Sequence, residues 1–111
     1  IAFHPGLLPA ASWQSLMGKL ARHYGTDASL DAVAARDIAA YLQANAGTGK
    51  RAREQPPEDR ITRSAWFLRE HDEVPAAAWK HPAVRSAANC AACHTAAGEG
   101  DYSERNIRIP R

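Results

Sequence analysis

The sequence is poor in large apolar side chains and in cysteine. Its 111 residues include only two Phe, three Trp, three Tyr and one Met, so much of the 45% hydrophobic fraction is alanine. A run of about 18 apolar residues is missing, which excludes a membrane-spanning helix. The formal net charge of +2 comes without a basic stripe, which argues against nucleic-acid binding. A chain of this length forms one domain or two very small ones, with a thin core.

Both cysteines belong to one motif, Cys90-Ala91-Ala92-Cys93-His94. Two thiols at this spacing, followed at once by a histidine, are typical of a covalent attachment site for c-type haem. Each thiol adds to one vinyl group of the porphyrin, and the histidine gives a nitrogen to the iron. Positions 90, 93 and 94 share one face of a helical turn. We therefore predict that Cys90 and Cys93 bind haem covalently and that His94 is an axial ligand.

Two other sites use similar residues. A structural zinc site needs a second ligand pair, but the sequence has no second cysteine pair and the remaining histidines are not suitably spaced. A thioredoxin-like redox pair is expected in a βαβ context, and no convincing strand lies near the motif. Haem attachment is the interpretation that the adjacent histidine favours.

Helical periodicity is clearest in the N-terminal half. A first amphipathic helix is expected over residues 12–24, with Ser12 as its N-cap. A second helix is expected to begin at an Asp27 or Ser29 cap and to end before Gly47. The short connection predicts that the two helices pack antiparallel as a hairpin.

The C-terminal half predicts shorter elements. One short helix is expected over 63–71, another turn of helix starts at Pro75, and a last helix over 86–97 carries the haem motif. Residues 101–111 are expected to be extended. The sequence therefore predicts an all-α fold, with an N-terminal helical hairpin and a C-terminal short-helix haem domain that ends in an extended tail.

A change of composition separates these halves. Residues 48–60 are charged, contain two prolines and are almost free of apolar side chains, which is typical of a linker or surface loop. We predict an N-terminal subdomain over residues 1–47, a linker over 48–60 and a haem domain over 61–111.

The ligand on the other side of the iron decides the class of function. A Met raises the reduction potential, a second His gives a lower one, and an open position binds small molecules. Met17 lies in a helical stripe and is expected to be a core residue. His71 is the better candidate; His81 is constrained by the following proline, but stays an alternative.

Several segments beside the haem motif occur together in one known family. They are Pro5-Gly6-Leu7-Leu8-Pro9, Ser12-Trp13, Leu16-Met17, His23-Tyr24-Gly25, Ala28-Ser29-Leu30, Arg60-Ile61-Thr62, Arg69-Glu70-His71, Asn89 to His94, and Arg108-Ile109-Pro110. With them the chain resembles the soluble dihaem cytochromes c of bacteria, which pass electrons to a small oxygen-binding monohaem cytochrome. In that family a first C-x-x-C-H lies just ahead of the segment that begins here at Ile1, whereas this sequence has only the second.

The resemblance implies two histidine ligands for each iron. His71 would be the second ligand of the haem on Cys90 and Cys93. The segment around His23 is also similar to one in the haem subunit of quinohaemoprotein amine dehydrogenases, where the corresponding histidine serves an N-terminal haem. His23 is therefore expected to be an axial ligand of a first haem, and the intact protein is expected to hold two.

These observations together predict a periplasmic electron carrier. The expected protein is not an enzyme; it is a monomer whose low-potential bis-histidine haem passes single electrons between redox proteins, a small oxygen-binding monohaem cytochrome among them. The alternative is a haem enzyme or gas-binding protein with an open or displaceable sixth iron position.

Overall fold

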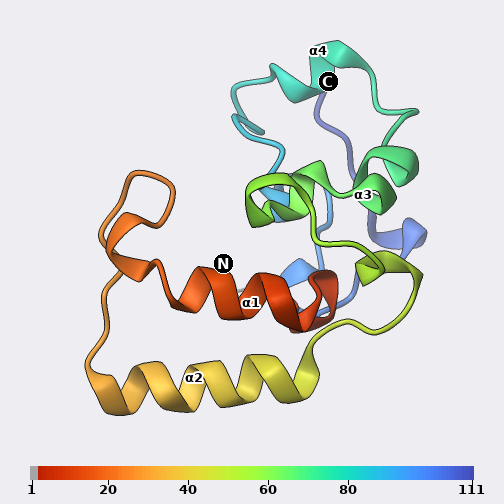
Figure 1. Cartoon of the computed structure of the whole chain (residues 1–111). Coiled ribbons are helices and arrows are strands. Elements are labelled where there is room, and N and C mark those ends of the chain that lie inside the picture. The colour runs from red at the N-terminus through yellow and green to blue at the C-terminus, as the bar shows by residue number, and fades with distance from the viewer. Residues whose placement is uncertain (1–2) are drawn as a thin grey trace. The chain divides into compact units, whose positions relative to one another are not determined.

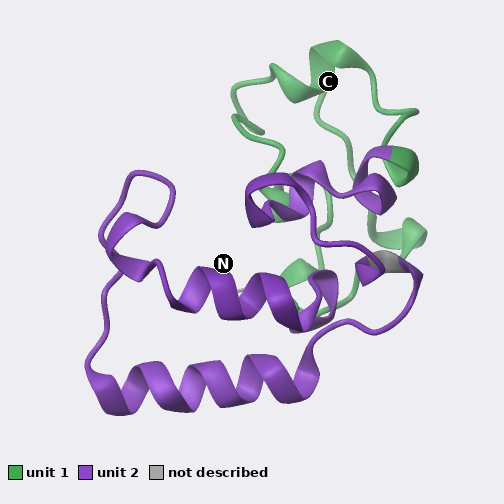
Figure 2. Cartoon of the chain, viewed as in Figure 1, with its two compact units in different colours: residues 1–4, 69–111 green, residues 5–68 purple. Residues whose placement is uncertain are grey.

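The computed structural model describes residues 3–111, apart from the side chain of Arg51, and the chain divides into two compact units (Figures 1 and 2). One unit comprises residues 5–68, and the other residues 69–111 with the N-terminal residues up to 4. The α-helices of the described residues are α1 (Ala10–Met17), α2 (Ala32–Asn45), α3 (Ala65–Glu70) and α4 (Ala76–Trp79), joined by short 3-10 turns. Only two isolated bridges are formed there in place of strands. The all-α prediction is confirmed.

Helices α1 and α2 form the predicted antiparallel hairpin of the unit 5–68 (Figure 1). Two hydrogen bonds tie its ends: the Gln43 side chain donates to the Ala10 carbonyl (3.0 Å), and the Gly47 N–H donates to the Leu8 carbonyl (2.9 Å). The buried apolar side chains of this unit are Leu7, Leu8, Trp13, Ala52 and Phe67. None of the helices in residues 3–111 has the length and apolar character needed to cross a bilayer.

The predicted first helix is wrong at both ends. Helix α1 begins after Pro9, so Ser12 lies inside it as a buried residue and is not its cap. It ends at Met17, before Gly18, and Leu20–Arg22 form a separate 3-10 turn. Glycine is a poor helix former, which explains why the helical spacing of the sequence runs past the actual end of the helix.

The cap of α2 also differs from the prediction. Asp31 caps this helix, because its carboxylate accepts the Ala34 N–H at 2.8 Å. Asp27 instead accepts the N–H and hydroxyl of Ser29 in a local turn. Acidic and hydroxyl side chains favour both structures, so sequence alone did not separate them.

Part of the segment 48–60 is packed against its unit. Ala52 and Asp59 within it are buried. The hydroxyl of Tyr24 lies 2.9 Å from the Glu58 carbonyl oxygen and 3.1 Å from that of Asp59, and shares its proton between them. The polar composition hid these contacts because most of them use the backbone.

These contacts bring the segment into the unit that ends at residue 68. The compact units therefore divide the chain eight residues beyond the expected linker. The functional ranges 1–47, 48–60 and 61–111 stay a prediction.

The haem motif does not lie in a helix over 86–97, and that prediction is wrong. Only Cys90–Ala92 form a 3-10 turn there. Arg85 adopts a left-handed backbone (φ 65°), and the Ser86 hydroxyl accepts the Ala88 N–H at 3.1 Å. Such a local side-chain bond competes with helix formation. The tail is extended except for a 3-10 turn, Glu104–Asn106.

Gly47 provides a test of the hairpin packing. A Cβ at this position would overlap the Gly6 carbonyl oxygen and the Ala52 Cβ, whereas a Cβ at Gly49 would meet nothing within 4 Å. We expect Gly47→Ala to lower the free energy of unfolding of the holoprotein by about 1–3 kcal/mol, as overpacking does. Gly49→Ala is the matched control in denaturant unfolding. Equal stability of the two variants would contradict the described packing.

Asp59 makes the stability of this unit depend on pH. Burial alone would raise the pKa of its carboxyl group, but a hydrogen bond from Gln55 (2.7 Å) and the nearby Lys19 ammonium, with other hydrogen bonds, hold that pKa below its usual value. A carboxyl group with a depressed folded pKa stabilises the protein above its unfolded pKa of about 3.9. That contribution is lost as the pH falls through the lower, folded pKa.

We therefore expect Asp59→Asn to be less stable than the wild type at pH 7, by about 1 kcal/mol for a weakened charge-assisted hydrogen bond. The difference should disappear in strong acid, when Asp59 itself is protonated. Denaturant unfolding from pH 7 down to a pH below the folded pKa of Asp59 measures this, with exposed Asp37→Asn as the control for loss of a charge. A difference that stays constant with pH would refute the assigned role of the carboxylate.

Candidate functional site

The Cys90–His94 motif closes a single tight turn. The carbonyl oxygen of Cys90 accepts the N–H of Cys93 at 3.3 Å and that of His94 at 2.8 Å. The Asn89 side chain, just before the turn, donates to the carbonyl of Val84 (3.0 Å), which is a buried core residue. The turn is thus closed by its own backbone and anchored to the small core of its unit.

The tail holds the other end of the motif. Residues 106–108 lie antiparallel beside residues 93–95. The bonds are Thr95 N–H to the Asn106 carbonyl (3.0 Å), the Thr95 hydroxyl to the same oxygen (2.9 Å) and Arg108 N–H to the Cys93 carbonyl (2.8 Å). His94 is therefore fixed through its backbone on both sides.

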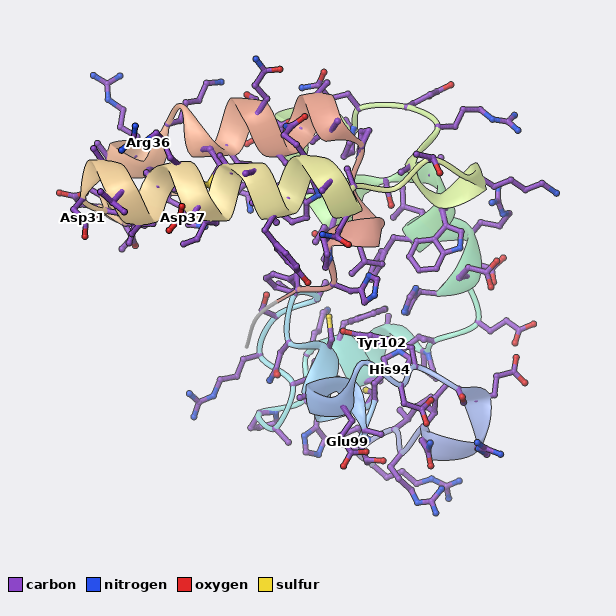
Figure 3. All side chains as sticks on the ribbon, turned by 90° about the horizontal axis from the view of Figure 1, so that it is seen from below. Asp31, Arg36, Asp37, His94, Glu99 and Tyr102 are labelled. Atoms are coloured by element: carbon purple, nitrogen blue, oxygen red, sulfur yellow. The ribbon has the colours of Figure 1, made fainter. Side chains whose placement is uncertain are left out.

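Three more rings lie close to the His94 ring or to each other. The rings of His71 and His94 have centroids 6.2 Å apart and planes inclined at 72°. Trp79 lies 6.0 Å from His71, and Tyr102 lies edge-on to His94 at 5.1 Å (Figure 3). His71 directly follows α3, and its carbonyl accepts the Val74 N–H at 3.2 Å. The structure thus brings His71 to His94, although 22 residues separate them.

Burial keeps the two thiols in their protonated form. It raises the pKa of Cys90 and of Cys93 above the usual value. Redox-active cysteine pairs have the opposite property, a pKa lowered by nearby positive charge or a helix N-terminus. The environment of the motif therefore argues against the dithiol alternative.

His94 has the properties of a metal ligand. Burial, with the nearby His71 as a second cause, lowers its pKa, and a neutral imidazole is the form that binds a metal. Its Nδ1 is buried and has no hydrogen-bonding partner among the described residues. A buried polar atom left in this way costs about 1–3 kcal/mol. Two half-buried thiols and a neutral imidazole on one turn fit the covalent haem expected from the motif.

His23 belongs to the unit 5–68 and resembles His94 in having a buried ring nitrogen without a partner among the described residues. It begins a tight turn in which its N–H donates to the Thr26 carbonyl (2.8 Å) and the Thr26 N–H donates back (3.0 Å). Tyr24 and Gly25 inside this turn have positive φ angles. The Nδ1 of His23 is also buried and lacks a partner in the part of the chain that the structure describes.

His81 is occupied by other contacts. Its Nδ1 accepts the Ala83 N–H at 3.0 Å, so its Nε2 carries the proton and donates to the Arg111 carbonyl at 3.1 Å. His4 is exposed, and Met17 is half-buried at the end of α1. Within residues 3–111 no cluster of three or more His, Cys, Asp or Glu side chains suits a metal ion. Of the histidines considered beside His94, His71 is the one in ring contact with it.

The sequence matches one family over almost all of its length. The model of the family described as dihaem cytochrome c matches residues 1–102. The chain belongs to this family. No curated protein matches the chain.

Two solved structures of dihaem cytochromes c are similar to it. The dihaem cytochrome c purified from Rhodobacter sphaeroides shares 44% identity, with 90% of this chain and 84% of that chain covered and a TM-score of 0.78. The dihaem cytochrome c from Shewanella baltica OS155 shares 35% identity over 99% of this chain and 83% of that chain, with a TM-score of 0.85.

Membership of the dihaem cytochrome c family indicates haem c cofactors and a role in electron transfer with redox partners. Cys90, Cys93 and His94, which the motif predicts to carry this role, lie together on the 90–94 turn. Sequence reasoning missed Tyr102, which contacts the ring of His94. The sequence carries no clear signal for this contact, because the tyrosine lies beyond the glycines that end the motif segment.

Proposed function

We propose that this dihaem cytochrome c is an electron carrier in which Cys90 and Cys93 hold one haem and in which His94 and His71 are its two axial ligands. The observation that carries the proposal is the pairing of the His71 ring with the ring of His94, the residue that follows the two cysteines in the motif. When bound, the haem supplies the one-electron chemistry of its iron. The chain's own residues bind it, orient it and limit the access of water.

The ring separation supports a shared metal ion. A metal–imidazole bond is about 2.0 Å long, and a ring with bonds of about 1.3–1.4 Å has a radius of about 1.1 Å. Two imidazoles on opposite sides of one metal ion therefore have centroids about 6 Å apart. The centroids of His71 and His94 are 6.2 Å apart. A directly stacked or hydrogen-bonded pair would bring them closer.

Two imidazole ligands would give the iron a low reduction potential, since a histidine nitrogen takes the place of the methionine sulfur that raises the potential in other cytochromes c. Both axial positions are then taken by the chain, which leaves no coordination site for a substrate or gas. Trp79 beside His71 and Tyr102 beside His94 present aromatic surface to the two ligands. We therefore infer that the protein carries electrons and is not an enzyme.

His23 is proposed as a ligand of a second haem in the intact protein. Its half-buried ring, in a turn held by reciprocal backbone bonds, supports this role. The Cys-x-x-Cys-His motif that would attach this haem is expected ahead of Ile1. The dihaem description of the family supports the same count.

The cellular setting follows from the chemistry of attachment and from the family resemblance. Covalent attachment of haem takes place outside the cytoplasm, which favours the periplasm. A small oxygen-binding monohaem cytochrome is the redox partner that the resemblance favours, and we expect the protein to act as a monomer.

The number of haems can be measured from the intact mass under denaturing conditions. We expect the natural protein to carry two covalent haems. The double variant Cys90→Ala, Cys93→Ala should lose the mass of one of them, because a c-type haem is held by its thioether bonds. A variant that keeps the full mass would show that these cysteines do not attach haem.

His71→Ala tests the axial ligand and separates the proposal from its alternative. We expect the haem on Cys90 and Cys93 to change from six-coordinate low-spin to a form that binds carbon monoxide, as seen by absorption spectroscopy, while the wild type does not bind it. His81→Ala is the matched control, because both ring nitrogens of His81 are engaged elsewhere. If the wild type binds carbon monoxide readily, it is a gas-binding protein or enzyme; if His71→Ala stays low-spin, the ligand assignment is wrong.

A further inference from the structure

Tyr102 contacts the proposed iron ligand from the tail. Its half-buried ring lies edge-on to the His94 imidazole, with centroids 5.1 Å apart and planes inclined at 63° (Figure 3). Aromatic rings prefer edge-to-face or offset arrangements over face-to-face stacking, because a ring edge is positive and a ring face is negative. The contact therefore favours one orientation of the imidazole over others.

The backbone on either side of Tyr102 is held in place. Gly100 adopts a left-handed conformation (φ 75°) and donates to the Ala97 carbonyl at 2.9 Å, and Asp101 donates to the Ala96 carbonyl at 3.1 Å. The carboxylate of Asp101 accepts the Ser103 N–H (2.9 Å) and the Asn106 amide (2.9 Å). The tyrosine ring is thus carried by a fixed segment.

His94 lacks the usual means of fixing its ring plane. A histidine that binds a metal normally donates its other ring N–H to a carbonyl, carboxylate or water, which sets its orientation. The Nδ1 of His94 has no such partner among residues 3–111. This imidazole contacts the rings of Tyr102 and His71, and its plane is inclined at 72° to that of His71.

The same arrangement occurs a second time in the chain. Tyr24 lies edge-on to His23 at 4.8 Å, with the planes again inclined at 63°, and the Nδ1 of His23 is also buried without a partner. Tyr24 in turn is held by the carbonyls of residues 58 and 59 and by the Arg60 guanidinium, 4.2 Å above its ring. At both histidines a tyrosine edge accompanies the missing hydrogen bond.

We propose that Tyr102 is a positioning residue, which holds the imidazole plane of His94 and so sets the angle between the two axial imidazoles of the haem. The inference rests on the proposed ligation by His71 and His94. It assigns to the tyrosine ring, rather than to its hydroxyl, the orienting role that a hydrogen bond plays at other metal-bound histidines.

Electron paramagnetic resonance of the oxidised holoprotein tests the inference. In low-spin ferric haem the angle between the two imidazole planes sets the spread of the g values. We expect Tyr102→Leu to shift the largest g value of the haem on Cys90 and Cys93, because the His94 ring is then free to turn. Tyr102→Phe should keep the wild-type value, since it keeps the ring and removes only the hydroxyl.

Two controls make the result decisive. Tyr41→Leu removes a tyrosine that is 58% exposed on α2 and should leave the spectrum unchanged. His71→Ala identifies the signal of the haem concerned by removing it from the low-spin region. Should Tyr102→Leu fail to accumulate as holoprotein, Tyr102→Met, of similar length and without a ring, takes its place.

The outcomes distinguish the proposed ligand pair from the proposed role of Tyr102. If His71→Ala leaves all low-spin signals intact, the proposed ligand pair is wrong. If His71→Ala removes one signal and Tyr102→Leu leaves that signal unchanged, the ligand pair stands and the positioning role of Tyr102 is refuted. A shift in Tyr102→Phe as large as in Tyr102→Leu would also refute it, because the ring would then not be the orienting element.

Discussion

The backbone pairing of residues 93–95 with residues 106–108 is the interaction on which the Cys90–His94 turn depends. A turn of five residues has too few bonds of its own to hold a ligand ring. Here the Cys90 carbonyl closes the turn from within, and the Cys93 carbonyl and Thr95 N–H are bound by the tail. The tail therefore contributes structure to the site from a segment that follows the motif. Its own turn at Asp101 brings Tyr102 to the same histidine.

The two compact units fix the backbone of His23 and of His94 with different local structures. His94 is fixed by pairing with a distant segment, whereas His23 is fixed by a bridge to Thr26 within one tight turn. In each case the backbone is fully bonded near the histidine while one ring nitrogen stays buried without a partner. Each ring is faced by a tyrosine edge at the same inclination. A backbone held in this way fixes the place of the imidazole, which a metal ligand requires.

The helical spacing of apolar residues predicted which of the longer helices form, but it did not predict where they end. The hairpin of α1 and α2 was predictable because apolar residues recur at helical spacing on both helices. The cap at Asp31, the early end of α1 and the absence of a helix around the haem motif were not. Each depends on competition between local hydrogen bonds, as at Ser86, or on a residue with a left-handed backbone such as Arg85. Such local features leave no periodic pattern in the sequence. The packed segment 48–60 escaped prediction because backbone carbonyls, not side chains, make its contacts with Tyr24.

By itself the sequence predicted the chemistry: two cysteines and a histidine at this spacing are typical of covalent haem attachment, since thioether formation and iron ligation need these atoms within one turn. It also determined the family and the all-helical class. Only the tertiary structure decided which histidine meets His94 and which ones do not. His71 is 23 residues away and His81 only 13, yet His81 is engaged by Ala83 and Arg111 while the ring of His71 lies 6.2 Å from that of His94. Distance along the chain says little about such pairs, because the turns between α3 and the motif set the path in space.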